Sequence, residues 1–86
     1  MSIQVHAPSA AIVLCRATAA VERAGVSHYS NRPDICHLTL RIDDEGSREP
    51  LRLTIQAPDV ATLRSIVRAA QTGLEQVEAA AQEVHA

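Results

Sequence analysis

An unbroken helical pattern of apolar positions fills the C-terminal third of the chain. From Asp59 to Val84 the apolar residues recur at alternating spacings of three and four, which places them on one face of a single α-helix. Pro58 blocks extension of this helix toward the N-terminus, and the Asp59 side chain is suited to cap its first turn. The predicted apolar stripe consists of Val60, Leu63, Val67, Ala70, Leu74, Val77, Ala81 and Val84.

The residues beside this stripe bear on how the helix packs. A self-pairing coiled coil usually carries opposite charges on both flanks of its seam. Here one flank carries Arg64, Gln71 and Glu78, whereas the other is mostly apolar or small. The resulting broad stripe is more typical of a helix that lies on a sheet and a second helix. A coiled coil is the alternative.

Two strands with period-two alternation precede this helix. Apolar residues alternate with polar ones over 36–42 and over 51–56, and the polar stretch 43–50 between them contains the turn residues Glu45-Gly46-Ser47. This pattern predicts an antiparallel hairpin with one buried face and one polar face. A shorter alternation over 3–7 predicts a first strand.

The segment between the first strand and the hairpin is rich in alanine. Ser9 is a favourable N-cap, the following residues are good helix formers, and Gly25 is a usual C-terminal cap. These residues predict a helix from Ser9 to Ala24 and a loop over 26–34. The predicted fold is a single small α+β domain over residues 1–86, in the order β-α-β-β-α. Its three-stranded antiparallel sheet has two helices packed on one face.

The C-terminal helix is longer than the sheet that this chain can build. At about 1.5 Å per residue it extends for about 39 Å, whereas the predicted strands span only about 20–23 Å. The core is also thin, because the chain has no Phe or Trp and Tyr29 is its one aromatic residue. Small domains of this kind are candidates for stabilisation by association. We therefore expect a second helix or another molecule to cover the end of the stripe.

Charge and cysteine content narrow the functional classes. The formal net charge of −2 argues against an autonomous nucleic-acid-binding protein, which normally has a basic excess. Cys15 and Cys36 are isolated and predict reduced, packed thiols, with a disulfide as the alternative. No signal peptide or membrane span is recognisable, so a cytoplasmic location is expected.

No catalytic constellation is recognisable in the sequence. Three glycines cannot build a phosphate-binding loop, and Cys15 has no identifiable base. His28, Cys36 and His37 suggest a ligand set, but neighbouring strand residues point to opposite faces and do not readily share a metal ion. The acidic stretch 43–45 is best explained as a solvated hairpin tip. We expect no catalytic residue, no metal and no cofactor.

The polar face of the predicted sheet is the second candidate surface. An ordinary solvated face is the simpler interpretation. The alternative is a surface for a partner or an RNA backbone, on which Arg41 and Arg52 contact phosphates. The lack of aromatic residues argues against base stacking. The residues of this face are His6, His37, Thr39, Arg41, Arg52, Thr54 and Gln56.

The order of elements and the residues of the last helix match the pattern of a known family. An opening strand runs into Ala7-Pro8-Ser9, Ile12-Val13 follow, and the strand pair leads to Asp59, Leu63-Arg64, Val67 and Leu74. In these respects the chain resembles the small Pcc subunits (CTAG/Pcc family) of the KEOPS, or EKC, complex, and the resemblance covers nearly its whole length.

Several positions depart from the family pattern. Arg68 and Ala70 stand where the family usually has an Asn and an aromatic residue, and Gln71 replaces a typical Leu. The hairpin loop is longer than the family's usual Gly-Asn turn. These departures are those of a divergent member or a paralogue.

The resemblance implies a non-catalytic accessory subunit. Members of the family dimerise, dock helices against the ATPase-fold threonylcarbamoyl-transferase subunit, and support threonylcarbamoyladenosine modification of tRNA, which the complex binds. We therefore expect a dimer with itself or with a paralogue, joined through strands, whose helices dock the larger subunit. The predicted docking residues are Ile12, Leu63, Val67, Ala70, Leu74 and Val77.

A stand-alone small RNA-binding module is the alternative function. It would use Arg41 and Arg52 on the sheet together with Arg64 and Arg68 on the last helix. Such a module requires affinity for tRNA without any partner.

Overall fold

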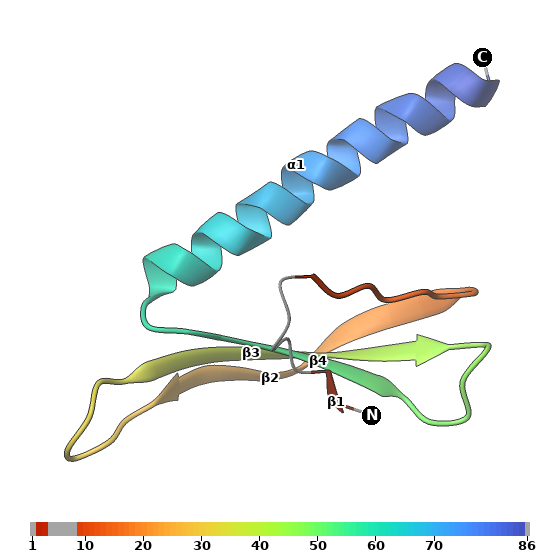
Figure 1. Ribbon diagram of the computed structural model, residues 1–86. Coiled ribbons are helices and arrows are strands. Elements are labelled where there is room, and N and C mark those ends of the chain that lie inside the picture. The colour runs from red at the N-terminus through yellow and green to blue at the C-terminus, as the bar shows by residue number, and fades with distance from the viewer. Residues whose placement is uncertain (1, 4–8, 86) are drawn as a thin grey trace.

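The structure, a computed structural model, describes residues 2–3 and 9–85 of the chain. Figure 1 shows a twisted sheet with a long helix above it that rises away toward the C-terminus. The elements are β1 (Ser2–Ile3), β2 (Ala17–Ser27), β3 (Ile35–Asp44), β4 (Leu51–Ala57) and α1 (Val60–His85).

The centre of the fold is the antiparallel sheet formed by β2, β3 and β4, with β3 in the middle. β3 and β4 are the predicted hairpin, in register from Cys36 opposite Ala57 to Ile42 opposite Leu51. The short β1 pairs in parallel with the far side of β4, so the strand order is β1-β4-β3-β2. Of the predicted first strand over 3–7, only Ile3 lies among the described residues, and it belongs to β1.

The predicted helix from Ser9 to Ala24 is wrong. Residues 9–16 are irregular, and β2 occupies the rest of this stretch. Alanine favours a helix by less than about 1 kcal/mol per residue over most residues. Pairing with β3, from Ala17 opposite Asp44 to Ser27 opposite Ile35, outweighs this local preference. The fold is therefore α+β with three antiparallel strands followed by one C-terminal helix (β-β-β-α), not β-α-β-β-α with two helices.

A β-bulge interrupts β2 at Glu22. Val21 lies opposite Leu40, and the pairing resumes with Arg23 opposite Thr39, so Glu22 has no partner on β3. The extra residue changes which side chains share a face, because a shift of one residue turns a strand over. As a result Ala24 lies on the same face as Val21, and Arg23 lies on the opposite face.

The two faces of the sheet separate apolar from polar side chains, as predicted for the hairpin. The apolar face contains the most buried side chains of the described residues, with Cys36 6%, Ile42 7% and Ala57 4% exposed. No described side chain is fully buried. The predicted thinness of the core is therefore confirmed.

The first turn of α1 is capped as predicted. The Thr62 backbone N–H donates to Asp59 Oδ1 over 2.7 Å, and the Leu63 N–H donates to the Asp59 carbonyl over 3.4 Å. From there α1 rises away from the sheet at an angle (Figure 1). The predicted short strands are wrong, because β2 and β3 have 11 and 10 residues and so extend for about 33–37 Å. The end of α1 is uncovered because the helix diverges from the sheet, and not because the sheet is much shorter. In the described part of the chain, no helix is both long and apolar enough to cross a membrane.

The chain is more open than a compact monomer of its size. Its radius of gyration is 15.6 Å, against about 12 Å for a compact chain of this length. Its exposed surface is 7083 Å², about 2,000 Å² more than the roughly 4,900 Å² expected for a compact protein of this mass. An isolated copy therefore leaves much of the surface that a folded protein usually buries in contact with water.

Candidate interaction surfaces

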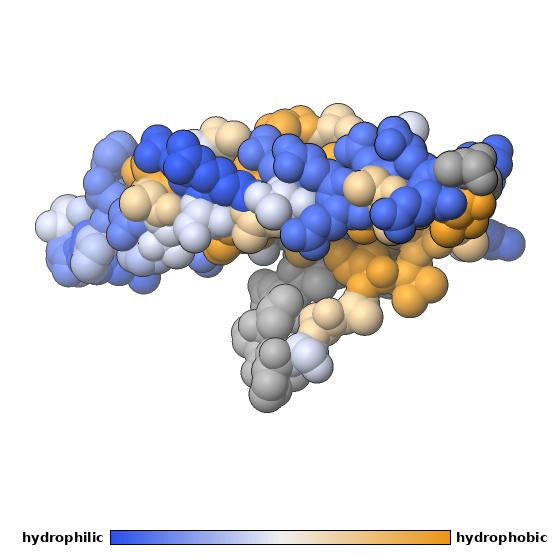
Figure 2. All heavy atoms as spheres, turned by 90° about the horizontal axis from the view of Figure 1, so that it is seen from above, coloured by the Kyte–Doolittle hydropathy of each residue, from blue (hydrophilic) through white to orange (hydrophobic). Residues whose placement is uncertain are grey.

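The apolar stripe of α1 is largely uncovered. Leu63 is its one half-buried large side chain, whereas Leu74 is 58%, Val77 65% and Val84 79% exposed. Figure 2 looks down on α1 and shows a mostly hydrophilic outer surface with hydrophobic side chains along its edges. The stripe therefore faces the space between α1 and the sheet, and the part of the chain that the structure describes leaves the large side chains of its C-terminal half more than half exposed.

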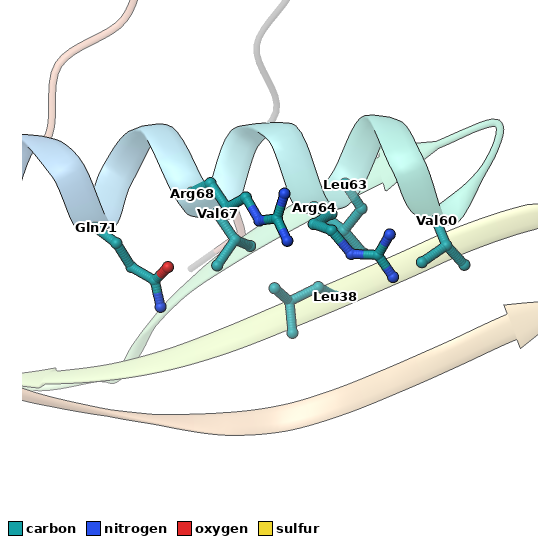
Figure 3. Close-up of a pocket in the computed structure, with 7 residues that line it drawn as sticks. All are labelled: Leu38, Val60, Leu63, Arg64, Val67, Arg68 and Gln71. Atoms are coloured by element: carbon teal, nitrogen blue, oxygen red, sulfur yellow. The ribbon is translucent and has the colours of Figure 1, made fainter.

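A groove of about 330 Å³ separates the N-terminal half of α1 from the sheet. Figure 3 shows Leu38 projecting from β3 toward Val67 and Leu63 on the helix above. The side chains of Arg64 and Arg68 extend along the opening of the groove. Its lining consists of Leu38, Val60, Leu63, Arg64, Val67, Arg68 and Gln71.

The structure places five of the six predicted docking residues on one helix and separates the sixth from them. Ile12 belongs to the irregular segment 9–16 and is 38% exposed. The predicted second docking helix does not exist, because its residues are irregular over 9–16 and form part of β2 from Ala17 on. The five docking residues on α1 are Leu63, Val67, Ala70, Leu74 and Val77.

The outer edge of β2 is a surface that the sequence reasoning missed. β2 ends the sheet, and no strand of the described residues pairs with its outer side. Such an edge presents unpaired backbone donors and acceptors, and here Val21 and Val26 are 64% and 45% exposed beside it. The β-branched residues Val21 and Val26 were the available signal, but the bulge at Glu22 puts them on one face despite their odd spacing and so hid the alternation.

The predicted polar face of the sheet is confirmed for β3 and β4. The register pairs His37 with Gln56, Thr39 with Thr54, and Arg41 with Arg52. The hydroxyl groups of Thr39 and Thr54 are 3.0 Å apart and hydrogen-bonded. The predicted member His6 lies outside the described residues.

The two arginines of this face that were predicted to contact RNA are already paired with carboxylates. Arg52 Nε donates to Glu22 Oε2 over 2.7 Å, which joins β4 to β2 above the central strand. Arg41 Nε donates to Asp43 Oδ1 over 3.3 Å. The hydrogen bond from Arg52, and then the charges of Arg52 and Arg41, hold the pKa of Glu22 below its ordinary value. These acids reduce the attraction of the face for phosphate groups.

The four arginines predicted to contact RNA do not form one surface. Arg41 and Arg52 lie on the polar face of the sheet, whereas Arg64 and Arg68 line the groove above Leu38 on the other side. Among the described residues, neither helix arginine forms an ion pair. A single phosphate-binding patch is therefore not assembled.

The cysteine and histidine residues that suggested a ligand set are kept apart. Cys36 is a buried free thiol on the apolar face, and His37 lies on the polar face opposite Gly25. His28 Nδ1 instead lies 2.9 Å from Asp34 Oδ2. Within residues 9–84, no three His, Cys, Asp or Glu side chains come together as a metal site would require.

Comparisons with protein families, with characterised proteins and with solved structures find no match to this chain. The resemblance to the Pcc subunits therefore stays a prediction. Its support from the first helix is lost, because Ile12 and Val13 lie in irregular chain. Its support from Asp59 and the stripe of α1 is unchanged.

Proposed function

We propose that this chain is a non-catalytic interaction subunit that forms a homodimer and docks a larger protein. The observation that carries this proposal is the uncovered stripe of α1, where the large side chains of the C-terminal half are more than half exposed. Burying an apolar side chain of this size is worth about 1.5–3 kcal/mol. The isolated copy also exposes about 2,000 Å² more surface than a compact protein of its mass, which likewise favours a partner.

The more specific proposal is a KEOPS-like complex that supports threonylcarbamoyladenosine modification of tRNA. It rests on the resemblance at Asp59, Leu63, Arg64, Val67 and Leu74. In this role the chain pairs with itself or a paralogue and docks the ATPase-fold threonylcarbamoyl-transferase subunit. Contact with tRNA is then made by the whole complex, which suits a chain whose net charge is −2.

Replacing Leu74 with Glu tests the docking role of the stripe. A carboxylate in the middle of an apolar contact loses its hydration, so assembly should fail. We expect Leu74→Glu to abolish dimerisation, measured by light scattering, and co-purification with a co-expressed transferase subunit. Thr72→Glu is the matched control, because Thr72 lies outside the stripe on the same helix. Unchanged assembly of Leu74→Glu would contradict the proposal.

A filter-binding titration with tRNA tests the alternative function. A stand-alone RNA-binding module requires affinity without partners and a binding constant that falls steeply with salt. The pairing of Arg41 and Arg52 with Asp43 and Glu22 predicts weak binding by the isolated chain. Tight, salt-sensitive binding would favour the RNA-binding module instead.

A further inference from the structure

We propose that the stripe of α1 is covered by α1 of a second copy, packed antiparallel about a twofold axis. The axis crosses the helix pair at the level of Thr72, whose own side chain lies on the face opposite the stripe. This inference rests on the proposed homodimer and specifies its contact. It assigns the stripe to the dimer contact, whereas the sequence predicted a dimer joined through strands and a stripe that docks the larger subunit. Three features of α1 carry it: the sizes of the stripe residues, the placement of charges, and the residues of the opposite flank.

The stripe residues complement one another in size when two helices run antiparallel. Pairing about Thr72 places Val67 against Val77 and Ala70 against Leu74 of the second copy. Leu63 then meets Ala81, and the end positions are two valines. Every layer therefore has a similar volume, which close packing requires. A parallel pair would instead stack Leu on Leu and Ala on Ala, leaving crowded layers next to empty ones.

The charges beside the stripe are also complementary in the antiparallel arrangement. Arg64 and Arg68 lie in the N-terminal half of α1, and Glu75 and Glu78 lie in the C-terminal half on the same flank. Antiparallel pairing brings Arg64 beside Glu78 and Arg68 beside Glu75 of the second copy. In a parallel pair this flank would instead face the mostly apolar or small flank of the second copy, so Glu78 would meet Gly73 and have no opposite charge.

The other flank of the stripe has small residues where the two helices would cross closest. Gly73 follows the proposed axis at Thr72, and a Cβ at Gly73 would have no neighbour within 4 Å. The fold of one copy therefore does not need a glycine here, although glycine costs the helix about 1 kcal/mol relative to alanine. Next to Gly73 of the second copy, the missing side chain lets the two backbones approach.

The groove and the C-terminal half of the stripe are complementary in this arrangement. The N-terminal half of the stripe faces the groove next to Leu38, and the C-terminal half rises away from the sheet. In an antiparallel pair, the C-terminal half of each stripe lies along the groove of the other copy, and its apolar side chains enter the opening. The surplus surface of about 2,000 Å² per copy exceeds the about 800 Å² that each partner contributes to a standard interface.

Charge reversal tests this pairing. We expect Arg64→Glu and Glu78→Arg each to weaken the dimer, raising its dissociation constant about tenfold or more, because each places like charges together at both ends of the symmetric interface. The double variant Arg64→Glu/Glu78→Arg should recover to within about threefold of the unchanged chain. Glu83→Arg, on the other flank, should have little effect. Sedimentation equilibrium gives the dissociation constants.

Disulfide trapping tests the direction of the helices. In a Cys15→Ser background, copies carrying Arg64→Cys are mixed with copies carrying Glu78→Cys and oxidised. We expect the mixed disulfide to form in preference to either identical pair. Preferential formation of identical pairs would show a parallel arrangement and overturn the inference.

The outcomes separate this inference from the proposed function. If the chain is a dimer that none of the reversals weakens, the helix contact is wrong and the proposed homodimer stands, with the edge of β2 as its contact. If the unchanged chain is a monomer at every concentration measured, both the inference and the proposed homodimer fail.

Discussion

At the scale of single residues, the carboxylate of Asp44 ties the turn between β3 and β4 to the chain that enters β2. Asp44 Oδ1 accepts the Cys15 backbone N–H over 2.8 Å, and Oδ2 accepts the Gly46 N–H over 3.0 Å. The Glu45 N–H donates to the Arg16 carbonyl over 3.0 Å. The acidic stretch predicted to be a solvated tip is therefore also a structural junction.

Gly46→Ala should destabilise this junction. An added Cβ would lie 2.8 Å from Cys15 Sγ and 3.1 Å from Asp44 Oδ2, closer than a methyl group fits, so we expect a loss of about 1 kcal/mol in the free energy of unfolding. Urea unfolding measures it. Introducing Gly46→Ala into a Cys15→Ala background should cost less, because the sulfur is gone. Equal losses in both backgrounds would show that the contact with Cys15 is unimportant.

At the scale of elements, the cap of α1 makes the helix sensitive to acid. The backbone N–H of Thr62, and then its side chain, hydrogen-bond to Asp59 and hold its pKa below the ordinary value of 3.8. A pKa lowered by folding adds stability above the unfolded value, and this stability is lost as the pH falls through the folded value.

Asp59→Asn isolates this contribution, because Asn also caps helices but does not titrate. We expect the unchanged chain to have the higher unfolding temperature at neutral pH. The difference should disappear as the pH falls below 3.8. Circular dichroism melts of both proteins over this range measure it. A difference that is constant with pH would contradict the assigned role of the Asp59 charge.

The elements that were predicted correctly are those whose local pattern and tertiary environment agree. In β3 and β4 the apolar positions form the face of the sheet that lies toward α1, and in α1 they form the stripe that faces the sheet. β2 was mistaken for a helix because its alanines favour one locally, while its stability depends on a distant strand. The ion pair of Glu22 with Arg52 could not be read from the sequence, since it requires the bulge.

Only part of the interaction surface could be predicted from the sequence, for the same reason. Leu74 and Val77 were recognisable from the apolar period of α1. Their exposure comes from the angle at which α1 leaves the sheet (Figure 1), and not from the short strands that were predicted. The position of Ile12 could not be predicted, because the helix expected over 9–24 does not form. The separation of Arg41 from Arg64 could not be predicted either, because it depends on which face of the sheet α1 covers. Local periodicity fixes which residues share an element face, and only the assembled sheet decides which faces meet.

At the scale of the whole molecule, folding and association should be a single process. With so few side chains buried in one copy, the dimer is expected to supply much of the native stability. The unfolding temperature should therefore rise when the protein concentration is raised over an about hundredfold range, as mass action requires. Melts at several concentrations test this, and a midpoint that does not move would show that one copy is stable alone.

The exposed end of α1 also has a consequence in the cell. A copy without a partner carries an exposed apolar helix end that its own fold does not bury. Chaperones and proteases act on exposed surfaces of this kind. Newly made chains should thus be short-lived until they meet a second one. The lifetime of the protein would then depend on its concentration, because more copies are paired when more are present. Unpaired copies would be removed without any separate regulator.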